Sequence, residues 1–296
     1  MTEPRAKQAR HGIRNARQLV RGAARRLQEA GVPESRVSAE VLLSELLGVG
    51  RGDLAVLEEP VSEEQAALYE AWISRRLERE PVQRILGLAY FRNLELKLDK
   101  HTLIPRPDTE SVVEAVLGVV DRRGGSCRVL DIGTGSGAIA ISIAQERPLC
   151  EVHATDESEE ALELALRNAE DTGVAVRFHR ADLVSGLEGL ADSVEVLVSN
   201  PPYIRSTDIP KLAPEVRDWD PPAALDGGPD GLVFYRRIFA EVKPLLASGA
   251  DLVLEVGDGQ AEDVLELGRR AGYVPLGTHV DLAGSPRAVL LRWGAG

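Results

Sequence analysis

Apolar residues in the first third of the chain recur at helical spacing. They repeat every three or four positions over 13–27, with arginines between them, and again over 37–47, which predicts one amphipathic helix for each range. Ser62 followed three positions later by Gln65 is a capping box and predicts a third long helix through about Arg79. These three helices, with short segments between them, indicate a small helical bundle.

The pattern changes after this bundle. Residues 88–98 form short β-like runs, which we interpret as a connecting hairpin, and a proline-containing segment then leads into a helix expected near 111–120. The chain therefore divides into three predicted parts. These are a helical domain over 1–85, a β-hairpin linker over 86–105 and a C-terminal domain over 106–296.

Strand-like and helix-like segments alternate beyond Cys127. Short apolar runs typical of strands occupy Arg128–Ile132, Val152–Asp156, Val176–His179, Val194–Ser199, Asp251–Val256 and Val289–Arg292. Helical periodicity occurs over Ala138–Glu146, Glu159–Glu170, Leu232–Leu246 and Gln260–Ala271. Alternation of this kind predicts a mostly parallel sheet with helices on both faces.

The last two strand-like segments have no helix between them. Residues 274–280 and 288–292 are joined through Ala283-Gly284-Ser285-Pro286, which suits a hairpin, and a hairpin places an antiparallel strand in the sheet. NAD-binding Rossmann domains usually lack that strand, whereas S-adenosylmethionine methyltransferases usually have it. The predicted fold class is therefore α/β, a Rossmann-like methyltransferase sheet with an antiparallel last strand and a small N-terminal helical bundle.

The composition is that of a globular chain. Of the 296 residues, 44% are hydrophobic and 28% are charged, which excludes the disordered class. No apolar run approaches the roughly 20 residues of a membrane span, and the basic N-terminus lacks the apolar segment of a signal peptide. We therefore expect a cytoplasmic protein with no membrane partner and with Cys127 and Cys150 as reduced thiols. The five histidines lack metal-site spacing, so no metal is expected.

Charge is distributed unevenly along the chain. The net charge of −12 argues against broad binding to a nucleic-acid backbone, which needs basic surface, so we expect no stable nucleic-acid binding. Residues 1–26 nevertheless carry eight basic side chains against the single acid Glu3. This segment is either a solvated helix face or a contact for RNA or a ribosome-bound partner.

A glycine-rich turn joins an apolar strand to a helix at Val129–Gly137. Its G-x-G-x-G spacing differs from the dinucleotide fingerprint, which uses a helix N-terminus for pyrophosphate. A methyl-donating sulfonium has no phosphate and carries positive charge beside an amino-acid group, so an acid just before the turn is expected. The predicted contacts to S-adenosylmethionine here are Asp131, Gly133, Thr134, Gly135, Ser136 and Gly137.

Two further acids follow the next two strands. Asp156 ends its strand where a carboxylate can accept hydrogen bonds from both ribose hydroxyls of the cofactor; the alternative is a cap for the following helix. Asp182 is placed to meet the adenine amino group, with Leu183 packing on the ring. An acid at a strand end is also an ordinary turn residue.

The motif Asn200-Pro201-Pro202-Tyr203 follows the strand-like run Val194–Ser199. An amide nitrogen is a poor nucleophile because its lone pair is delocalised. Acceptors on the Asn200 side chain and the Pro201 carbonyl can each take one N–H, while proline offers no competing donor, and Tyr203 can stack on the planar group. Catalysis by positioning and electrostatics makes these four residues the predicted catalytic set.

Several longer motifs accompany this one. They are Tyr90-Phe91, LIPRPDTE at Leu103–Glu110, ALDGGPDGL at Ala224–Leu232 and DLAGSPR at Asp281–Arg287. With the helical bundle, they make nearly the whole chain resemble the PrmC/HemK family of peptide chain release factor N5-glutamine methyltransferases. The resemblance implies transfer of a methyl group from S-adenosylmethionine to the glutamine of the Gly-Gly-Gln motif, with a release factor as the protein partner.

The resemblance also assigns parts of the chain. It implies a pocket bordered by Phe91 and Arg106. Because every cofactor and catalytic motif lies beyond Leu103, we predict that residues 1–85 dock the substrate and that residues 106–296 form the methyltransferase domain. The resemblance further implies that Asn200 contacts both cofactor and glutamine. The alternatives are a glutamine methyltransferase acting on a ribosomal protein, a DNA or RNA amino-methyltransferase, and a catalytically silent cofactor-binding module.

Overall fold

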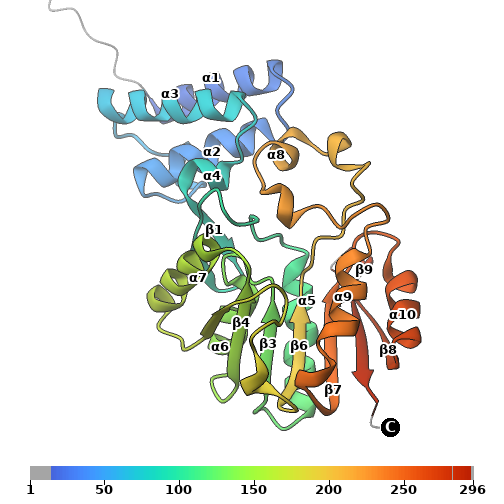
Figure 1. Ribbon diagram of the computed structural model, residues 1–296. Helices are drawn as coiled ribbons and strands as arrows, with labels where there is room; N and C mark the ends of the chain where they lie inside the picture. The colour runs from blue at the N-terminus through green and yellow to red at the C-terminus, as the bar shows by residue number, and fades with distance from the viewer. Residues whose placement is uncertain (1–14, 282, 295–296) are drawn as a thin grey trace, which may run out of the picture. The chain divides into compact units, whose positions relative to one another are not determined.

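The computed structural model describes residues 15–281 and 283–294. The chain forms two compact units that divide between Leu86 and Gly87, and each is described by itself (Figure 1). The basic residues Arg5, Lys7, Arg10 and Arg14 and the predicted helix start at Ile13 lie outside the described residues.

The first unit is helical, as its periodicity predicts. Its helices are α1 (Ala16–Glu29), α2 (Ser35–Leu47), α3 (Glu63–Leu77) and α4 (Val82–Leu86), with one turn of 3₁₀ helix at Asp53–Ala55. Their apolar faces meet in one core, whose fully buried members are Ala16, Leu27, Ala39, Leu42, Leu43, Tyr69 and Ile73. Since an amphipathic helix gains most of its stability from burying one face, this shared core accounts for the bundle.

Local sequence signals set the ends of these helices. The predicted capping box is confirmed, because the Gln65 backbone N–H donates to Ser62 Oγ at 3.1 Å and the Ser62 N–H donates to Gln65 Oε1 at 3.0 Å. The Asn15 side chain caps α1 in the same way, accepting from the Arg17 N–H at 2.8 Å. Each cap satisfies a backbone donor that has no partner within its helix.

The second unit begins with the predicted hairpin, β1 (Leu88–Phe91) and β2 (Leu94–Lys97), paired antiparallel. The long helix α5 (Thr109–Arg122) follows. Beyond it, the chain forms a seven-stranded sheet with the strand order β5-β4-β3-β6-β7-β9-β8. The hairpin groups with this unit rather than with the helices before it.

Five strands of the sheet are parallel and carry the alternation seen in the sequence. These are β3 (Arg128–Ile132), β4 (Glu151–Asp156), β5 (Arg177–Arg180), β6 (Val194–Ser199) and β7 (Leu246–Glu255). The last strand, β9 (Pro286–Trp293), runs antiparallel between β7 and β8 (Tyr273–Val280). The predicted antiparallel last strand is confirmed.

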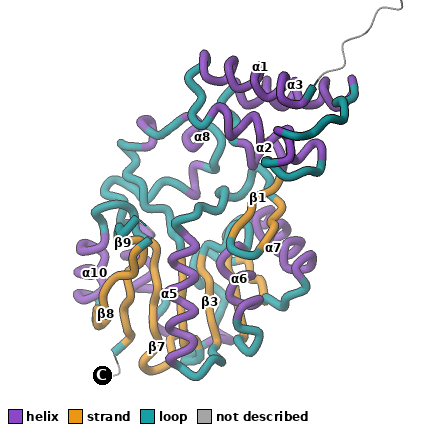
Figure 2. The backbone as a smooth tube through the Cα atoms, turned by 180° about the vertical axis from the view of Figure 1, so that it is seen from behind, coloured by secondary structure: helices purple, strands orange, loops and turns teal. Residues whose placement is uncertain are grey.

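Helices cover both faces of this sheet. The helices α5, α6 (Ala138–Glu146) and α7 (Glu159–Thr172) contribute to the core on one face, and Figure 2 shows α5 and α6 lying over it. The helices α9 (Val233–Glu241) and α10 (Ala261–Arg270) contribute to the core on the other. Short one-turn segments lie at Glu188–Leu190, Ile209–Lys211, Pro214–Arg217 (α8) and Pro222–Ala224.

One predicted helix is wrong in its extent. The range 232–246 was expected to be a single helix leading to a strand at Asp251, but α9 ends at Glu241 and β7 begins at Leu246. A 3₁₀ turn, Lys243–Leu245, separates them. Pro244 has no backbone N–H and its ring clashes with the carbonyl four residues earlier, so a helix does not continue through it.

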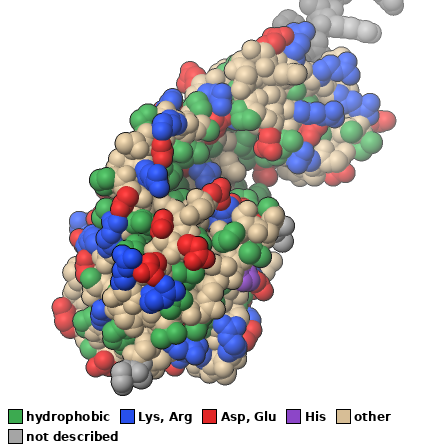
Figure 3. Space-filling view, turned by 90° about the vertical axis from the view of Figure 1, so that its right-hand side faces the viewer, with side chains coloured by type: hydrophobic (Ala, Val, Ile, Leu, Met, Phe, Trp, Pro, Cys, Tyr) green, Lys and Arg blue, Asp and Glu red, His purple; other side chains and the backbone are tan. Residues whose placement is uncertain are grey.

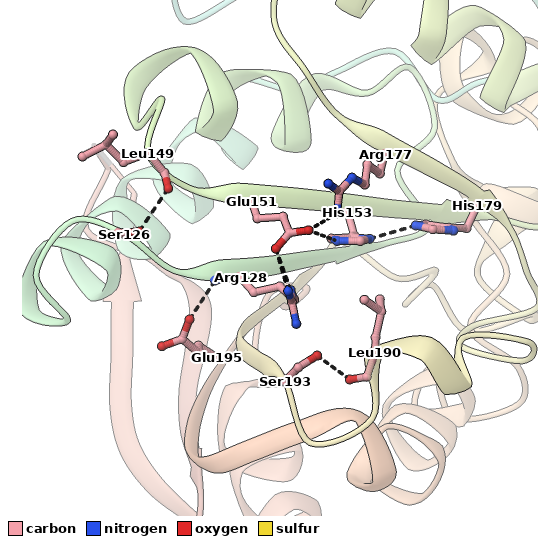
Figure 4. Close-up of polar contacts among 10 residues, drawn as sticks. All are labelled: Ser126, Arg128, Leu149, Glu151, His153, Arg177, His179, Leu190, Ser193 and Glu195. Carbon is pink, nitrogen blue, oxygen red and sulfur yellow. Dashed lines mark hydrogen bonds and ion pairs between the residues drawn. The ribbon is translucent and has the colours of Figure 1, made fainter.

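A polar cluster joins β3, β4 and β5 (Figure 4). Glu151 accepts from Arg128 at 2.7 Å and from Arg177, and the His153 and His179 rings stack with centroids 5.1 Å apart. Their facing nitrogens, Nδ1 and Nε2, are 2.9 Å apart. Burial lowers the pKa of both imidazoles and so favours their neutral forms, in which one ring nitrogen can donate to the other.

Candidate active site

A cavity of about 190 Å³ opens at the carboxyl ends of β3, β4, β5 and β6. Ligands bind in this crevice in open α/β sheets because the loops there diverge. The lining joins segments far apart in sequence, at 101–109, 132–139, 156–161, 181–183, 199–202 and 221–224, together with Phe234. Ten predicted site residues share it: Arg106, Gly133, Thr134, Ser136, Asp156, Asp182, Leu183, Asn200, Pro201 and Pro202.

The glycine-rich turn forms the bend between β3 and α6. Gly137 is the residue before the first turn of α6 and has a φ of +85°. A Cβ there would lie 2.7 Å from Ile141 Cδ1 and 3.2 Å from the Ala165 Cβ. Glycine therefore supplies both the left-handed backbone and the close packing of α6 on α7, and this bend brings Gly133, Thr134 and Ser136 to the cavity.

Asp131 lies beneath that turn and outside the cavity lining. It is fully buried, and its Oδ2 accepts from the Thr134 hydroxyl at 2.6 Å. Burial raises the pKa of this carboxyl to about 7. Its Oδ1 has no hydrogen-bond partner among the described residues, so this oxygen is available as an acceptor. The contact of Asp131 with the amino-acid group of the cofactor stays a prediction.

Asp156 is at the end of β4 and lines the cavity. Its Oδ2 accepts from the Gly135 N–H at 2.9 Å and its Oδ1 from the Ser158 N–H at 3.0 Å. Burial raises the pKa of this carboxyl, and these backbone N–H groups oppose the rise. The N-cap of α7 is Ser158, whose hydroxyl accepts from the Ala161 N–H at 3.1 Å. The alternative interpretation of Asp156 as the helix cap is therefore wrong.

Asp182 and Leu183 follow β5 and form another part of the wall. The Asp182 carboxylate is largely exposed and pairs with Arg237 at 3.0 Å. Leu183 is buried and has a φ of +52°. The predicted adenine contact needs an acceptor for the amino group and an apolar surface for the ring, and Asp182 and Leu183 are of these two types. Asp182 already has a cationic partner in Arg237.

The Asn200–Tyr203 motif follows β6, and its first three residues line the cavity. Asn200 Nδ2 donates to the Thr109 hydroxyl at 3.3 Å. Tyr203 is not part of the lining: its hydroxyl lies 3.5 Å from Glu255 Oε1, and burial raises its pKa above the ordinary value. Its carbonyl accepts from Gln260 Nε2 at 3.0 Å. Tyr203 thus contacts Glu255 of β7 and Gln260 at the start of α10, on the side away from the cavity lining.

The two residues assigned by resemblance are placed differently. Arg106 lines the cavity, and its guanidinium pairs at 2.5 Å with Asp220, whose side chain is fully buried. Phe91 is 1% exposed and packs in the core with residues of β2 and α5, outside the lining. The structure therefore brings Arg106, but not Phe91, to the cavity.

Sequence reasoning missed many of the lining residues, among them Thr109 and Pro221, and two buried acids near the site, Asp220 and Glu255. Thr109 lies in the LIPRPDTE segment and Pro221 lies just before the ALDGGPDGL segment, so these motifs mark their neighbourhood. Asp220 and Glu255 carry no such signal, because the side-chain contacts with Arg106 and Tyr203 join residues far apart in the sequence. Their burial in the folded chain is what identifies them.

Three expectations concern other parts of the molecule. Both cysteines are free thiols, and burial raises the pKa of Cys127 to about 11. Within 15–281 and 283–294, no group of three or more His, Cys, Asp or Glu side chains is arranged to hold a metal ion. No helix in the described ranges is long and apolar enough to cross a membrane.

Comparison with known proteins identifies the family. Two family descriptions match, the PrmC N-terminal domain over residues 18–87 and the methyltransferase small domain over 113–214. A release factor glutamine methyltransferase from Rhodospirillum rubrum is 44% identical over 93% of this chain and 84% of its own length. The chain belongs to the release factor glutamine methyltransferase family.

Other members of this family are similarly close. The protein of that name from Geobacter sulfurreducens is 42% identical over 89% of this chain and 91% of its own. The one from Streptomyces coelicolor is 40% identical over 91% and 95%. Among solved structures, a methyltransferase from Pyrococcus furiosus matches with a TM-score of 0.49 and 20% identity over 69% of this chain and 91% of its own.

Proposed function

We propose that this protein transfers a methyl group from S-adenosylmethionine to the side-chain amide nitrogen, N5, of the glutamine in the Gly-Gly-Gln motif of peptide chain release factors. The observation that carries the proposal is that Asn200, Pro201 and Pro202 line the same cavity as the glycine turn and Asp156. The printed names of relatives that match over most of both chains supply the substrate. Such a substrate implies a cytoplasmic enzyme.

The cavity suits the three parts of this cofactor. The buried Asp131 oxygen without a partner lies under the turn, where a cationic amino group needs an acceptor. Asp156 has oxygens that each hold one backbone N–H, and a carboxylate with about four lone-pair sites keeps capacity for two ribose hydroxyls. Leu183 offers an apolar surface for adenine. The cofactor supplies an activated methyl group on sulfur.

The catalytic motif suits an amide nucleophile. Asn200 uses its Nδ2 on Thr109, which leaves its Oδ1 as an acceptor for one substrate N–H. The Pro201 carbonyl is the second proposed acceptor, and the prolines bring no competing backbone donor. Held in this way, the nitrogen would be oriented to accept the methyl group that bound S-adenosylmethionine would supply. The nitrogen then loses its proton to solvent, so no strong general base is required.

We also propose that residues 1–85 dock the protein substrate and that residues 106–296 carry out the methyl transfer. Residues 86–105 would link these two parts. A cavity that accepts one glutamine contacts few residues, whereas a specific protein complex usually buries about 1,200–2,000 Å² in total. The helical unit supplies such a surface, and basic side chains gather on one side of it (Figure 3).

A groove of about 470 Å³ on the helical unit is lined by several basic side chains. Arg17, Arg21 and Arg25 of α1 line it with Arg36 and Arg51. The last two share the carboxylate of Glu40 at 2.7 and 3.0 Å. Neither Arg17 nor Arg21 forms an ion pair with another described residue, so both remain available to an acidic patch of the partner. Charge complementarity of this kind raises association rates and makes them sensitive to salt.

Labelled S-adenosylmethionine tests the function directly. The full-length protein is incubated with a release factor, with the same factor carrying alanine for the Gly-Gly-Gln glutamine, with ribosomal proteins and with oligonucleotides. We expect label only on the intact release factor. Label on a ribosomal protein or an oligonucleotide in its place would support the corresponding alternative, and cofactor binding without transfer to any substrate would indicate a silent module.

A further inference from the structure

Within the described part of the chain, Arg106 is the one arginine or lysine that lines the cavity. Its side chain is 36% exposed. The acids of the lining, Asp156, Glu157 and Asp182, follow β4 and β5, on the side of the sheet where we place the cofactor. Arginine keeps its positive charge in proteins, so this guanidinium is a permanent cation at the cavity.

Two hydrogen bonds connect Arg106 with the catalytic asparagine. The Thr109 N–H donates to the Arg106 carbonyl at 3.1 Å, and the Thr109 hydroxyl accepts from Asn200 Nδ2 at 3.3 Å. All three residues line the cavity. The guanidinium and the proposed acceptors for the substrate amide, Asn200 Oδ1 and the Pro201 carbonyl, therefore border the same space.

A cation in this position conflicts with the selection of an amide. The two proposed oxygen acceptors favour a group with N–H donors and disfavour an ionised carboxylate, which only accepts. A guanidinium has the opposite preference, because its planar N–H groups match a carboxylate and bind it through two parallel hydrogen bonds. Without a counter-charge, Arg106 would therefore attract glutamate into a cavity that otherwise suits glutamine.

Asp220 supplies that counter-charge. Its Oδ2 accepts from Arg106 Nη2 at 2.5 Å and its Oδ1 accepts from the Ile104 N–H at 3.4 Å. The Asp220 side chain is fully buried, and a buried carboxylate is stable only with such partners. Opposite charges in contact cancel much of each other's field, so the pair presents N–H donors to the cavity with little net charge.

Backbone hydrogen bonds hold the loop that carries Asp220. The Asp220 N–H donates to the Val216 carbonyl at 3.0 Å. Further along the loop, the Ile204 N–H donates to the Leu225 carbonyl at 3.0 Å, and the Gly227 N–H donates to the Ile204 carbonyl at 2.8 Å. Because Ile204 directly follows the catalytic motif, these bonds fix the loop next to the proposed substrate site.

We propose that Asp220 is a specificity-determining residue, which neutralises Arg106 and thereby fits the substrate end of the cavity to an uncharged amide and against a carboxylate. This inference rests on the proposed function, in which the substrate side chain is a glutamine. Asp220 takes no part in the methyl transfer itself. Its effect should appear in the ratio of the affinities for the glutamine and glutamate forms of one protein substrate.

Asp220→Asn tests the proposal in the full-length protein. The substitution keeps the shape of the side chain and one acceptor oxygen for Arg106, but it removes the negative charge. Calorimetry with S-adenosylhomocysteine bound measures the Kd of a release factor and of the same factor carrying glutamate in place of the Gly-Gly-Gln glutamine. Contacts elsewhere cancel in the ratio of these two constants. We expect this ratio to shift by about tenfold or more towards the glutamate form, and an unchanged ratio would overturn the proposal.

A second substitution separates the effect of charge from a loosened loop. Adding Arg106→Met to Asp220→Asn removes the cation as well, so the ratio should return to within about threefold of the wild-type value. A loop that is merely loosened would not regain selectivity in this way, so a double variant that keeps the shifted ratio would contradict the proposal. Should Asp220→Asn fail to fold, Arg106→Met alone carries the test. It should bind the glutamate form no more tightly than wild type does, and tighter binding would refute the charge argument.

Asp251→Asn is the matched control. It removes one negative charge from another buried acid, which pairs with Arg123 and Arg292 at 2.8 Å each and lies outside the cavity lining. It should lower the Tm and leave the ratio unchanged, and a shift as large as that of Asp220→Asn would overturn the proposal. If the wild-type protein does not methylate release factor, the proposed function is wrong; if it does and Asp220→Asn keeps the wild-type ratio, only the role of Asp220 is wrong.

Discussion

Replacement of Asp156 by alanine should weaken cofactor binding far more than it weakens folding. Each carboxylate oxygen already accepts one backbone N–H, from Gly135 at 2.9 Å and from Ser158 at 3.0 Å. Each therefore has one lone-pair site left for a ribose hydroxyl. The proposed loss is two hydrogen bonds to an ionised acceptor, together with the anchor of the glycine turn.

We expect the loss of binding free energy to be on the order of 1.5–3 kcal/mol, the scale of hydrogen bonds to charged groups. This corresponds to a Kd for S-adenosylmethionine that is about 10- to 150-fold higher. Asp156→Asn keeps one carbonyl oxygen and should fall between wild type and Asp156→Ala. Isothermal titration calorimetry measures all three proteins at the same pH and salt concentration.

A helix-cap variant remote from the cavity serves as the control. Ser62 caps α3 in the first unit, so Ser62→Ala should cost about 1 kcal/mol of folding stability and leave the cofactor Kd unchanged. An Asp156→Ala protein with wild-type affinity would refute the ribose role. A Ser62→Ala protein with equally weak binding would show that global destabilisation, and not the lost carboxylate, explains the effect.

Three further predictions concern chemistry, pH and docking. Asn200→Ala should fold and bind cofactor but lose roughly two or more decades of single-turnover rate, as on removal of a key polar contact in the transition state; a wild-type rate would contradict this. Burial lowers the pKa of His153 and His179 below the ordinary 6.5, so the unfolded state binds protons at a higher pH than the folded state. The contribution of these histidines to stability should be complete above about pH 6.5 and should fall as the pH drops towards their pKa values in the folded protein. His179→Gln should flatten that decline in Tm, and an unchanged slope would exclude this pair as its source. Arg17→Glu combined with Arg21→Glu should lower kcat/KM on whole release factor, most at low salt, without affecting a short Gly-Gly-Gln peptide; equal effects on both substrates would exclude docking.

The sequence alone predicted the segments to which we assign the chemistry. The glycine turn, the acids after two strands and the Asn200–Tyr203 motif are local patterns, and each lies within a few residues of a strand end. Since the carboxyl ends of parallel strands meet at one edge of a sheet, the order of these motifs was enough to predict a shared cavity. The final hairpin likewise followed from the absence of a helix between two strand-like runs, and β9 confirms it.

Only the tertiary structure decided which side chains support those motifs. Glu255 is 55 residues from Asn200 in sequence, and Asp220 forms its ion pair across an interval of 114 residues. No local spacing encodes such contacts, because they depend on strand order and on how α5 packs against the sheet. The same reason places Phe91 in the core and not at the cavity.

Tertiary structure also excluded one of the two local roles that the sequence allowed for Asp156. Sequence allowed Asp156 to be either a helix cap or a ligand contact, and the hydroxyl of Ser158 took the cap. The prediction that Tyr203 stacks on the planar substrate group rested on a local motif, but Tyr203 is not part of the cavity lining and instead contacts Glu255 and Gln260. Residue types and their order determine what chemistry a site can perform. The orientation of its side chains depends on contacts with residues that are distant in the sequence.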